Sequence, residues 1–483
     1  MHAPVILWFR RDLRLADNPA LAAAAQTGAP VIPVFILDEA ETGRPPGGAA
    51  RWWLGKSLAA LDRSLRTRGS RLILRRGDAA GAIADLAAET GAGAVLWNRL
   101  YEPEAVQRDH EAAAGLARLG AVARDFKTGL LNEPGDVRNG AGEPYRVFTA
   151  YWRTARTRVS PGRPSPAPEV LAAPEDWPSG DRLATWGLAP TRPDWSRGFS
   201  DWTPGEAGAQ ARLHDFMDGG LSDYAMGRNR LLGGAISRLS PHLHWGEIGP
   251  RQVMLAVQGL VHAGRTPEAP AEAFIAELGW REFAAQLLVQ APDMATRNLR
   301  PAFDRFAWRD SEADFAAWTR GRTGYPVVDA AMRELWATGF MPGRARMIVA
   351  SFLAKHLLID WRRGEAWFWD TLVDADLASN AMNWQWSAGS GVDAQPFFRI
   401  FNPVSQGRKF DPGGDYVRRW VPELAALPGD VIHAPWTADP VSLAAAGVRL
   451  GDTYPHPIVD HALARARALE ALAASRRVSA ESS

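Results

Sequence analysis

The sequence predicts a fold in two parts, a Rossmann-like α/β domain with a parallel sheet followed by an all-α domain. In the first 128 residues, short apolar runs alternate with Ala/Leu-rich segments. From about residue 206 the pattern changes to long helical periods, and a proline-rich stretch separates the two regions. Repeated strand–helix alternation requires a parallel sheet with right-handed crossovers. Long helical periods with few strand candidates indicate a helical domain.

Five apolar runs supply the expected strands, because strands covered by helices on both faces read as nearly continuous apolar segments. These runs are 5–9 (VILWF), 31–37 (VIPVFIL), 71–74 (RLIL), 94–97 (AVLW) and 121–126 (AVARDF). Helices are expected between them at 18–27, 51–68, 78–90 and 103–119. Asp17 is expected to cap the first helix. No GxGxxG follows the first strand, so the dinucleotide-binding fingerprint is absent.

The same patterns give the expected domain boundaries. We expect the α/β domain over 1–128, a linker over 129–205, the helical domain over 206–470 and a frayed tail over 471–483. Nine prolines with little periodicity between 161 and 204 are typical of a linker. Within the helical domain, residues 271–290 and 341–361 are predicted as long helices.

Composition limits the class of protein. The 483 residues are 46% hydrophobic and 23% charged, which is ordinary for a globular chain. No apolar run reaches 18 residues, and the N-terminus lacks the cleavage site of a signal peptide, so we expect a cytoplasmic protein without a membrane partner. Because there is no cysteine, disulfides, thiolate zinc sites and iron–sulfur clusters are excluded.

Charge and two residue types stand out. A net charge of +1 excludes a broad electrostatic DNA binder, so any basic binding face is expected to be local. Only four of the 55 cationic residues are lysines, and the chain holds 21 tryptophans. The tryptophan excess calls for an explanation beyond packing.

Three segments contain residues that can carry chemistry. The first is GGAISRLSPHLHWGEIGPR, residues 233–251. Ser237, Ser240 and Pro241 are either an anion site at a helix start or only a capped helix. His242 and His244 have no third ligand at zinc spacing, so no metal is expected.

The second segment is ELGWREF, residues 277–283. Glu277 and Arg281 are four residues apart and share a helix face, which also fits an ordinary surface ion pair. Trp280 lies on the same side, where packing is the alternative interpretation.

The third segment runs from Arg346 to DADLASNAMNWQW, residues 374–386. Asp374 and Asp376 form a D-x-D pair, but a hard cation needs more oxygen ligands than the segment offers. A buried Arg–Asp pair that lines a polar cofactor explains these residue types better.

Eight segments of the sequence resemble segments of the DNA photolyase and cryptochrome family and occur in the same order. They are WFRRDLRLADNPAL, EPYRVFTAYWR, SRLSPHLHWGEI, ELGWREF, GRTGYPVVDAAMREL, ASFLAKHLLIDW, DADLASNAMNWQWSAGSGVDAQPFFRIFNP and GRKFDPGGDYVRRWVPEL. The match covers roughly residues 4 to 436. The resemblance implies an N-terminal antenna domain and a helical domain that holds FAD. The lack of cysteine also excludes the iron–sulfur branch of this family.

The resemblance implies an FAD site in the helical domain. Arg346 and Asp374 would pair beside the isoalloxazine, Asp376 would contact its polar edge, and Asn380 would lie at flavin N5. The implied FAD-binding residues are Tyr224, Ser237, Arg238, Leu239, Ser240, Glu277, Arg281, Arg346, Asp374, Asp376 and Asn380.

The implied activity is light-dependent repair of cyclobutane pyrimidine dimers in UV-damaged DNA, a carbon–carbon lyase reaction driven by an electron from photoexcited reduced FAD. Its implied catalytic residues are Glu277, Asn380, Trp280 and Trp386. The implied DNA contacts are Arg228, Trp280, Arg344 and Arg399. Trp308, Trp361 and Trp384 align with the family's electron-transfer chain.

Glu102 matches a family position near the antenna chromophore, for which we expect methenyltetrahydrofolate, with deazaflavin as the alternative. The chain is expected to be a monomer. One position departs from the family pattern. Gly343 stands before Arg344 where dimer photolyases carry asparagine, so one side-chain hydrogen bond is missing or replaced by water. The rival hypothesis is a cryptochrome photoreceptor without repair activity. The stretch that follows the matched region is too short for a plant-type regulatory tail, which argues against that hypothesis.

Overall fold

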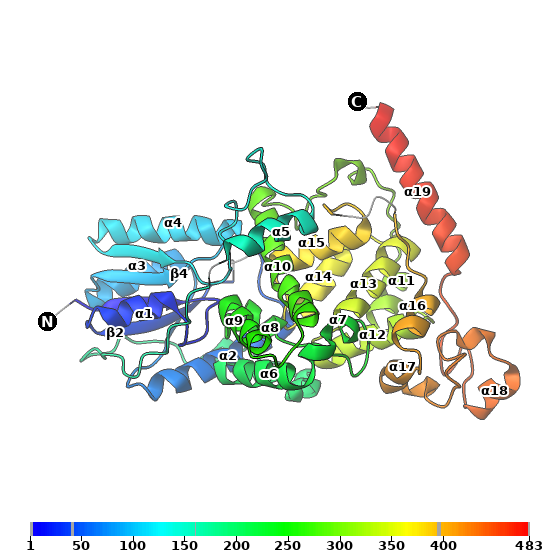
Figure 1. Cartoon of the computed structure of the whole chain (residues 1–483), viewed down its shortest axis with the longest axis horizontal. Helices are drawn as coiled ribbons and strands as arrows, with labels where there is room; N and C mark the ends of the chain where they lie inside the picture. The colour runs from blue at the N-terminus through cyan, green and yellow to red at the C-terminus, as the bar shows by residue number, and fades with distance from the viewer. Residues whose placement is uncertain (1–2, 40–42, 160, 394–397, 482–483) are drawn as a thin grey trace. The chain divides into compact units, whose positions relative to one another are not determined.

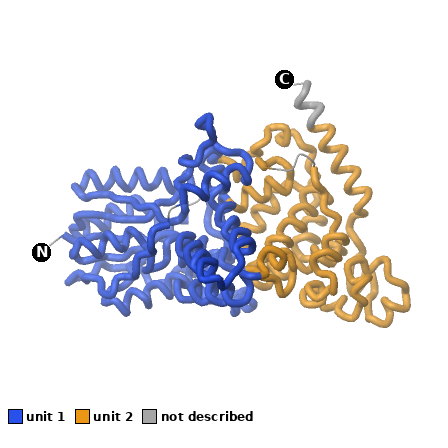
Figure 2. Tube along the Cα trace, in the orientation of Figure 1, with its two compact units in different colours: residues 1–222, 237–292, 373–378 blue, residues 223–236, 293–372, 379–483 orange. Residues whose placement is uncertain are grey.

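The structure is a computed structural model that describes residues 3–39, 43–159, 161–393 and 398–481. The chain forms two compact units (Figure 2). Unit 1 comprises Met1–Ser222, Ser237–Pro292 and Val373–Ala378, and unit 2 comprises Asp223–Ile236, Asp293–Leu372 and Ser379–Ser483.

A five-stranded parallel sheet forms the N-terminal part of unit 1 (Figure 1). Its strands are β1 (Val5–Phe9), β2 (Val31–Leu37), β3 (Ile73–Arg76), β4 (Ala94–Asn98) and β5 (Val122–Phe126), in the order β3-β2-β1-β4-β5. The helices between them are α1 (Pro19–Gln26), α2 (Gly48–Arg66), α3 (Ala79–Thr90) and α4 (Pro103–Arg118). Because the strand order reverses after β3, right-handed crossovers place α1 and α2 on one face and α3 and α4 on the other. The α/β fold is confirmed.

Two local expectations for this sheet are wrong. The strand predicted at 121–126 is not covered on both faces, since β5 lies at the sheet edge and its Val122 is 60% exposed. The cap of α1 is Asn18, whose side chain accepts from Leu21 N–H, and not Asp17. Asp17 has a positive φ of 54° and binds Arg251 instead.

Helices complete unit 1. They include α5 (Phe148–Arg158), η1 (Leu183–Trp186), η2 (Ser196–Asp201), α6 (Glu206–Gly219), α8 (Ser240–His244), α9 (Pro250–His262) and α10 (Glu268–Gln290). The segment predicted as a linker thus contains α5, and unit 1 joins the sheet to helices beyond residue 206. The boundaries expected from the sequence stay predictions.

Unit 2 is helical. Its elements are α7 (Tyr224–Gly227), η4 (Pro301–Phe303), α11 (Glu312–Thr319), α12 (Pro326–Thr338), α13 (Gly343–Ser351), a π-helical segment (Phe352–His356), α14 (Trp361–Thr371), α15 (Leu377–Ala388, in unit 2 from Ser379), α16 (Pro403–Phe410), α17 (Asp415–Trp420), η6 (Pro422–Leu424), η7 (Pro435–Thr437), α18 (Pro440–Ala445) and α19 (His461–Glu481). The last helix, α19, includes residues expected to fray.

The single helix predicted over 341–361 is wrong. After α13 the helix continues as the wider turn of the π-helical segment, and Leu358 then has a positive φ of 53°. Asp360 starts a new helix, α14, by accepting a hydrogen bond from Arg362 N–H. Over the described ranges, no helix is both long and apolar enough to cross a membrane.

Candidate functional site

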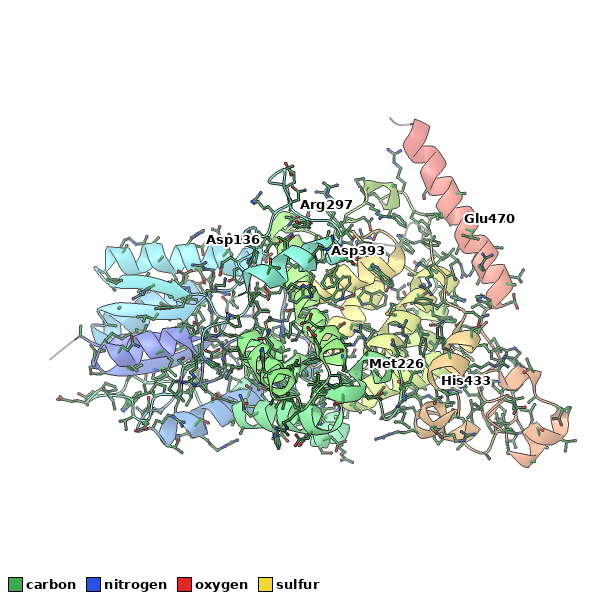
Figure 3. The ribbon with its side chains drawn as sticks, in the orientation of Figure 1. Asp136, Met226, Arg297, Asp393, His433 and Glu470 are labelled. Atoms are coloured by element: carbon green, nitrogen blue, oxygen red, sulfur yellow. The ribbon has the colours of Figure 1, made fainter. Side chains whose placement is uncertain are left out.

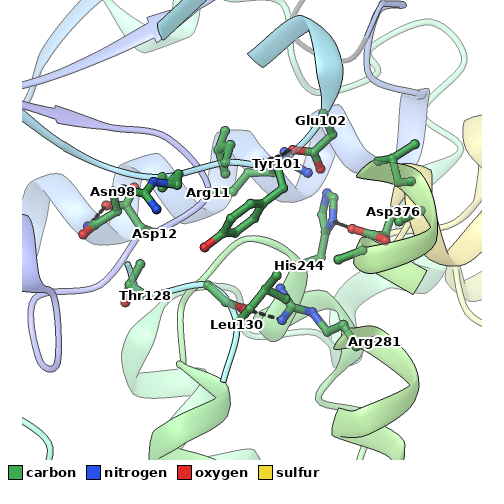
Figure 4. A pocket seen from close by; sticks show the side chains of 16 residues that line it. Arg11, Asp12, Asn98, Tyr101, Glu102, Thr128, Leu130, His244, Arg281 and Asp376 are labelled. Atoms are coloured by element: carbon green, nitrogen blue, oxygen red, sulfur yellow. Dashed lines mark hydrogen bonds and ion pairs between the residues drawn. The ribbon is translucent and has the colours of Figure 1, made fainter. Parts of the chain in front are cut away.

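A pocket opens in unit 1 where the strand order of the sheet reverses (Figure 4). Arg11 and Asp12 follow β1, and residues 98–102 begin at the end of β4, its neighbour. The carboxyl ends of parallel strands at such a reversal are the usual ligand site of open α/β sheets. The pocket is lined by Arg11, Asp12, Asn98, Arg99, Leu100, Tyr101, Glu102, Thr128, Gly129, Leu130, His244, Arg281, Ala285, Leu288, Asp376 and Ala378.

The buried carboxylates of this pocket have cationic or hydrogen-bonding partners. Glu102 is 7% exposed and pairs with Arg11. Burial opposes its ionisation, but the Arg11 guanidinium outweighs that and holds the pKa of Glu102 below its ordinary value. Asp376 Oδ2 lies 3.4 Å from His244 Nδ1. Burial again opposes ionisation, yet His244, Arg281 and Arg11 keep the pKa of Asp376 well below its usual range.

One wall of the pocket, residues 128–130, is held by helix α10. Arg281 donates from Nη1 to Gly129 O at 2.5 Å. The next residue, Glu282, accepts from Leu131 N–H at 2.9 Å and from Asn132 N–H at 2.7 Å. Glu282 is 2% exposed, and burial raises its pKa to about 7 despite these two hydrogen bonds. Sequence reasoning does not single out Glu282, because its role depends on a loop 150 residues away.

Residues 237–240, expected to hold FAD, lie at the start of α8 in unit 1. Arg238 has a positive φ of 52°, and its guanidinium lies 4.2 Å from the Trp202 ring centroid. Ser237 Oγ accepts from Leu239 N–H at 3.3 Å. Leu239 is buried, whereas Ser240 is exposed. Left-handed backbone at a bulky residue costs free energy and concentrates at functional sites.

Glu277 and Trp280 lie on α10 in unit 1. Trp280 stacks on Phe148 of α5, with 3.7 Å between ring centroids and an 11° angle between the planes. Gly279 is needed here, because a Cβ at that position would lie 2.5 Å from Trp152 Cε3. The sequence does not mark Phe148 as a site residue, although it lies within the family segment EPYRVFTAYWR.

The other acidic residue expected beside FAD in unit 1 is Asp374, which is 8% exposed. In unit 2, Arg346 donates from Nε to Met341 O at 2.8 Å and lies 5.5 Å from the Phe340 ring. Tyr224, also in unit 2, is 8% exposed.

Asn380 of α15 is oriented by Glu365 of α14, both in unit 2. The Asn380 amide nitrogen donates to Glu365 O at 3.0 Å and to Glu365 Oε1 at 2.7 Å. Because both Glu365 oxygens are acceptors, the Asn380 side-chain nitrogen must point toward them. The Asn380 carbonyl oxygen Oδ1 therefore points away from Glu365. A carbonyl oxygen is the acceptor that a protonated flavin N5 needs, so this residue fits FAD.

The three tryptophans aligned with the electron-transfer chain lie in unit 2. Trp361 and Trp384 are buried, and Trp308 is half-buried. The Trp384 ring lies against the first turn of α14, the helix that begins at Trp361, because Gly364 leaves room for it; a Cβ there would clash with Trp384. Trp308 packs on Phe306, 4.5 Å between centroids. The backbone beside Trp308 is tied to Leu358 O by Arg309 N–H at 2.7 Å.

Trp386, expected among the catalytic residues, also lies in unit 2. Its Nε1–H donates to the carbonyl oxygen of Asp393, labelled in Figure 3, at 3.2 Å. Gly343, where the family pattern is broken, is exposed at the start of α13, and a Cβ there would meet nothing within 4 Å. The position thus has room for a side chain.

The arginines expected to bind DNA gather in unit 2. The pKa of Arg344 is lowered, mainly by burial and further by the positive charges of Arg228 and Arg399. Arg344 donates to Asn229 Oδ1 at 2.6 Å through Nη2, and its guanidinium lies 4.5 Å from the Phe410 ring centroid. Like charges held close together are the electrostatic footprint of an anionic partner. We call Arg228, Arg344 and Arg399 the arginine cluster.

Comparisons with known proteins agree with this geometry. A family described as DNA photolyase matches residues 5–169, and one described as FAD binding domain of DNA photolyase matches residues 274–474. The chain is 53% identical to a deoxyribodipyrimidine photo-lyase of Agrobacterium fabrum, over 98% of each chain. It is 42% identical to cryptochrome-1 of Arabidopsis thaliana, over 97% of this chain and 70% of that one.

Among solved structures, a bacterial class III photolyase from Agrobacterium tumefaciens superposes with a TM-score of 0.96 at 53% identity, over 99% of this chain and 98% of the other. Full-length identity and fold agree with the domain matches. The chain therefore belongs to the DNA photolyase family.

Proposed function

We propose that the protein is a deoxyribodipyrimidine photo-lyase, which splits cyclobutane pyrimidine dimers in UV-damaged DNA with light. The observation that carries the proposal is the presence in unit 2 of the arginine cluster together with an Asn380 that presents a carbonyl acceptor. Support comes from the full-length relative of that name at 53% identity.

The arginine cluster accounts for the DNA part of the reaction. Arg228, Arg344 and Arg399 each offer a guanidinium to a phosphate, and phosphate contacts position a duplex without reading its sequence. Because only these few arginines are needed, a net charge of +1 is compatible with DNA binding. Photolyases are among the enzymes that take their target base out of the stack. Trp280 and Trp386 provide ring faces for the extruded dimer.

The residues expected around FAD account for the electron chemistry. The chemistry that reduced FAD would supply, when bound and excited by light, is the transfer of one electron to the dimer and its return after the ring has split. Glu365 holds the Asn380 amide by its nitrogen, so that Oδ1 would be available as an acceptor for the flavin edge. Arg346 and Asp374 contribute opposite charges. A hydrogen bond donated by the Glu277 carboxyl group would steady the negative charge that develops on the dimer.

The proposed antenna site is the pocket of unit 1 with Glu102 in its wall, which also contains Arg281 and Asp376, two of the residues expected around FAD. We propose methenyltetrahydrofolate as its chromophore, with deazaflavin as the alternative, because hydrogen-bonding groups at the sheet reversal suit a planar heterocycle. We also propose that the protein acts in the cytoplasm as a monomer.

Light-dependent repair tests the proposal. The reduced, FAD-loaded protein is mixed with an oligonucleotide that contains one thymine dimer, and intact dimers are counted by chromatography after blue light or darkness. Loss of dimers in the light alone is expected. Unchanged dimers with FAD bound would contradict the proposal and favour a cryptochrome photoreceptor.

Glu277→Ala should lower the repair yield per absorbed photon about tenfold or more, because one charge-stabilising contact to the reacting group is worth a few kcal/mol. The matched control is Glu272→Ala on the same helix, where an exposed Glu272 pairs with Arg156 at 3.1 Å. A Glu277→Ala protein that repairs as fast as the control would remove Glu277 from the mechanism.

Trp308→Phe should stop photoreduction of oxidised FAD and leave repair by chemically reduced protein intact. Phenylalanine keeps the packing on Phe306 but is much harder to oxidise than tryptophan. Flavin absorbance under blue light with an external reductant measures the first step. Normal photoreduction in this variant would show that electrons leave by another route.

A further inference from the structure

Lys355, one of four lysines in the chain, lies in the π-helical segment of unit 2 and is 5% exposed. Its ammonium donates to Arg399 O at 2.7 Å and lies 4.5 Å from the Phe398 ring centroid. Burial lowers the pKa of Lys355 to about 7. Burial is the cause of this lowering, and no carboxylate among the described residues counters it.

A buried ammonium without a carboxylate partner is costly to the fold. Desolvation disfavours the charge, and one carbonyl hydrogen bond and one ring face compensate it only in part. Methionine would fill a similar volume without that penalty, so packing alone does not call for a lysine here. The π-helical turn fits this view, since such turns occur frequently at functional sites.

Lys355 acts on a short segment of backbone, residues 398–401. It holds the Arg399 carbonyl, and Ser351, one turn earlier, accepts from Phe401 N–H at 3.4 Å through Oγ. The Arg399 side chain is exposed and its guanidinium lies 5.2 Å from the Phe401 ring. The backbone on both sides of Ile400 is therefore fixed from inside, while the Arg399 guanidinium faces outward.

We propose that Lys355 is a positioning residue for DNA binding, whose hydrogen bond to the Arg399 carbonyl holds the Arg399 guanidinium ready for a DNA phosphate. This inference rests on the proposed function, which assigns Arg399 to the DNA contact. Lys355 itself touches no DNA. It fixes in advance the backbone that would otherwise lose its freedom on binding, and such preorganisation raises affinity.

The test measures the dissociation constant of the FAD-loaded protein for a dimer-containing duplex between 50 and 200 mM salt. It compares Lys355→Met, Arg399→Ala and the double variant with the parent. Each phosphate contact contributes about 0.9 to the slope of log K against log salt. We expect both single variants to bind about five- to tenfold more weakly, with slopes smaller by up to about 0.9. The double variant should bind no more weakly than Arg399→Ala.

Thermal unfolding of the same proteins supplies a second readout. Lys355→Met should melt at the parent's temperature or a few degrees higher, because a desolvated charge has been removed. A matched control is Arg449→Ala in unit 2, which removes an exposed cation paired with Asp452 and should change neither binding nor slope.

The outcomes separate the two hypotheses. If Arg399→Ala binds like the parent, the proposed phosphate contact fails and the inference falls with it. If Arg399→Ala is weak but Lys355→Met binds normally, only the inference is overturned. A double variant weaker than Arg399→Ala, or a Lys355→Met protein that melts lower or does not fold, would show that the ammonium serves the fold and would equally contradict the inference.

Discussion

The pocket of unit 1 and the arginine cluster of unit 2 hold charge in opposite ways. In the pocket, Glu102 pairs with Arg11, and the positive charges of Arg281 and Arg11 act on Asp376, so the charges compensate one another within the protein. In the cluster, positive charges lie together without compensation. Burial is the largest cause of the lowered pKa of Arg344, and the charges of Arg228 and Arg399 lower it further. Internal compensation suits a small ligand recognised by shape and hydrogen bonds, whereas accumulated positive charge suits a polyanion.

This difference separates stability from binding. Removing one charge from the pocket leaves its partner buried and uncompensated, which costs folding free energy. Removing one charge from the cluster relieves repulsion and costs affinity for DNA instead.

The largest expected loss of stability follows from Glu102→Gln, which leaves the Arg11 guanidinium buried with a neutral partner. Both side chains of the pair are less than 10% exposed. Breaking such a pair costs about 3–5 kcal/mol. Urea unfolding of the protein measures the free energy of unfolding.

The control for Glu102→Gln is Glu89→Gln, which breaks the exposed pair of Glu89 with Arg75 in the same unit. An exposed pair is worth about 0–1 kcal/mol. Equal losses in the two variants would mean that the pocket charges are not compensated in the way described.

A smaller, pH-dependent effect is expected at Glu282. Its pKa is about 7 in the folded protein against 4.5 for an ordinary glutamate, so between these values the folded state binds more protons than the unfolded state. Stability therefore falls as pH rises from about 4.5 to 7 and is level above that range. The loss is on the order of 3 kcal/mol for a shift of this size.

Glu282→Gln isolates this contribution, because glutamine stays neutral throughout. The difference in unfolding free energy between parent and variant should move in the variant's favour as pH rises from 4.5 to 7. A difference that does not change over this range would show that the pKa of Glu282 is not raised in the folded protein and that its two backbone hydrogen bonds offset burial.

Much of the sheet could be predicted from sequence. The runs 5–9 and 31–37 coincide with β1 and β2, because continuous apolar residues bounded by turns permit few other assignments. The break between α13 and α14 could not be predicted, since residues 341–361 keep a helical apolar period through the π-helical segment. Local periodicity does not report a widened turn or the positive φ of Leu358.

The site residues divide in the same manner. The segments that resemble the photolyase and cryptochrome family pointed to Asn380, Arg344 and Arg399. Residue type and order along the chain are sufficient for that identification. They could not show that Glu365 orients the Asn380 amide or that Lys355 holds the Arg399 carbonyl, because these contacts join residues 15 and 44 positions apart. Partners brought together only by packing leave no spacing rule to read.

The salt dependence of DNA binding tests the central contrast most directly. The variant Arg228→Ala/Arg344→Ala/Arg399→Ala is compared with Arg66→Ala/Arg75→Ala/Arg156→Ala, which removes three arginines from surface ion pairs of unit 1. With three phosphate contacts at about 0.9 each, the cluster variant should lose about 2.7 from the slope of log K against log salt, and the unit 1 variant should keep the parent's slope. Equal slopes in both variants would contradict the account that DNA binding resides in the arginine cluster.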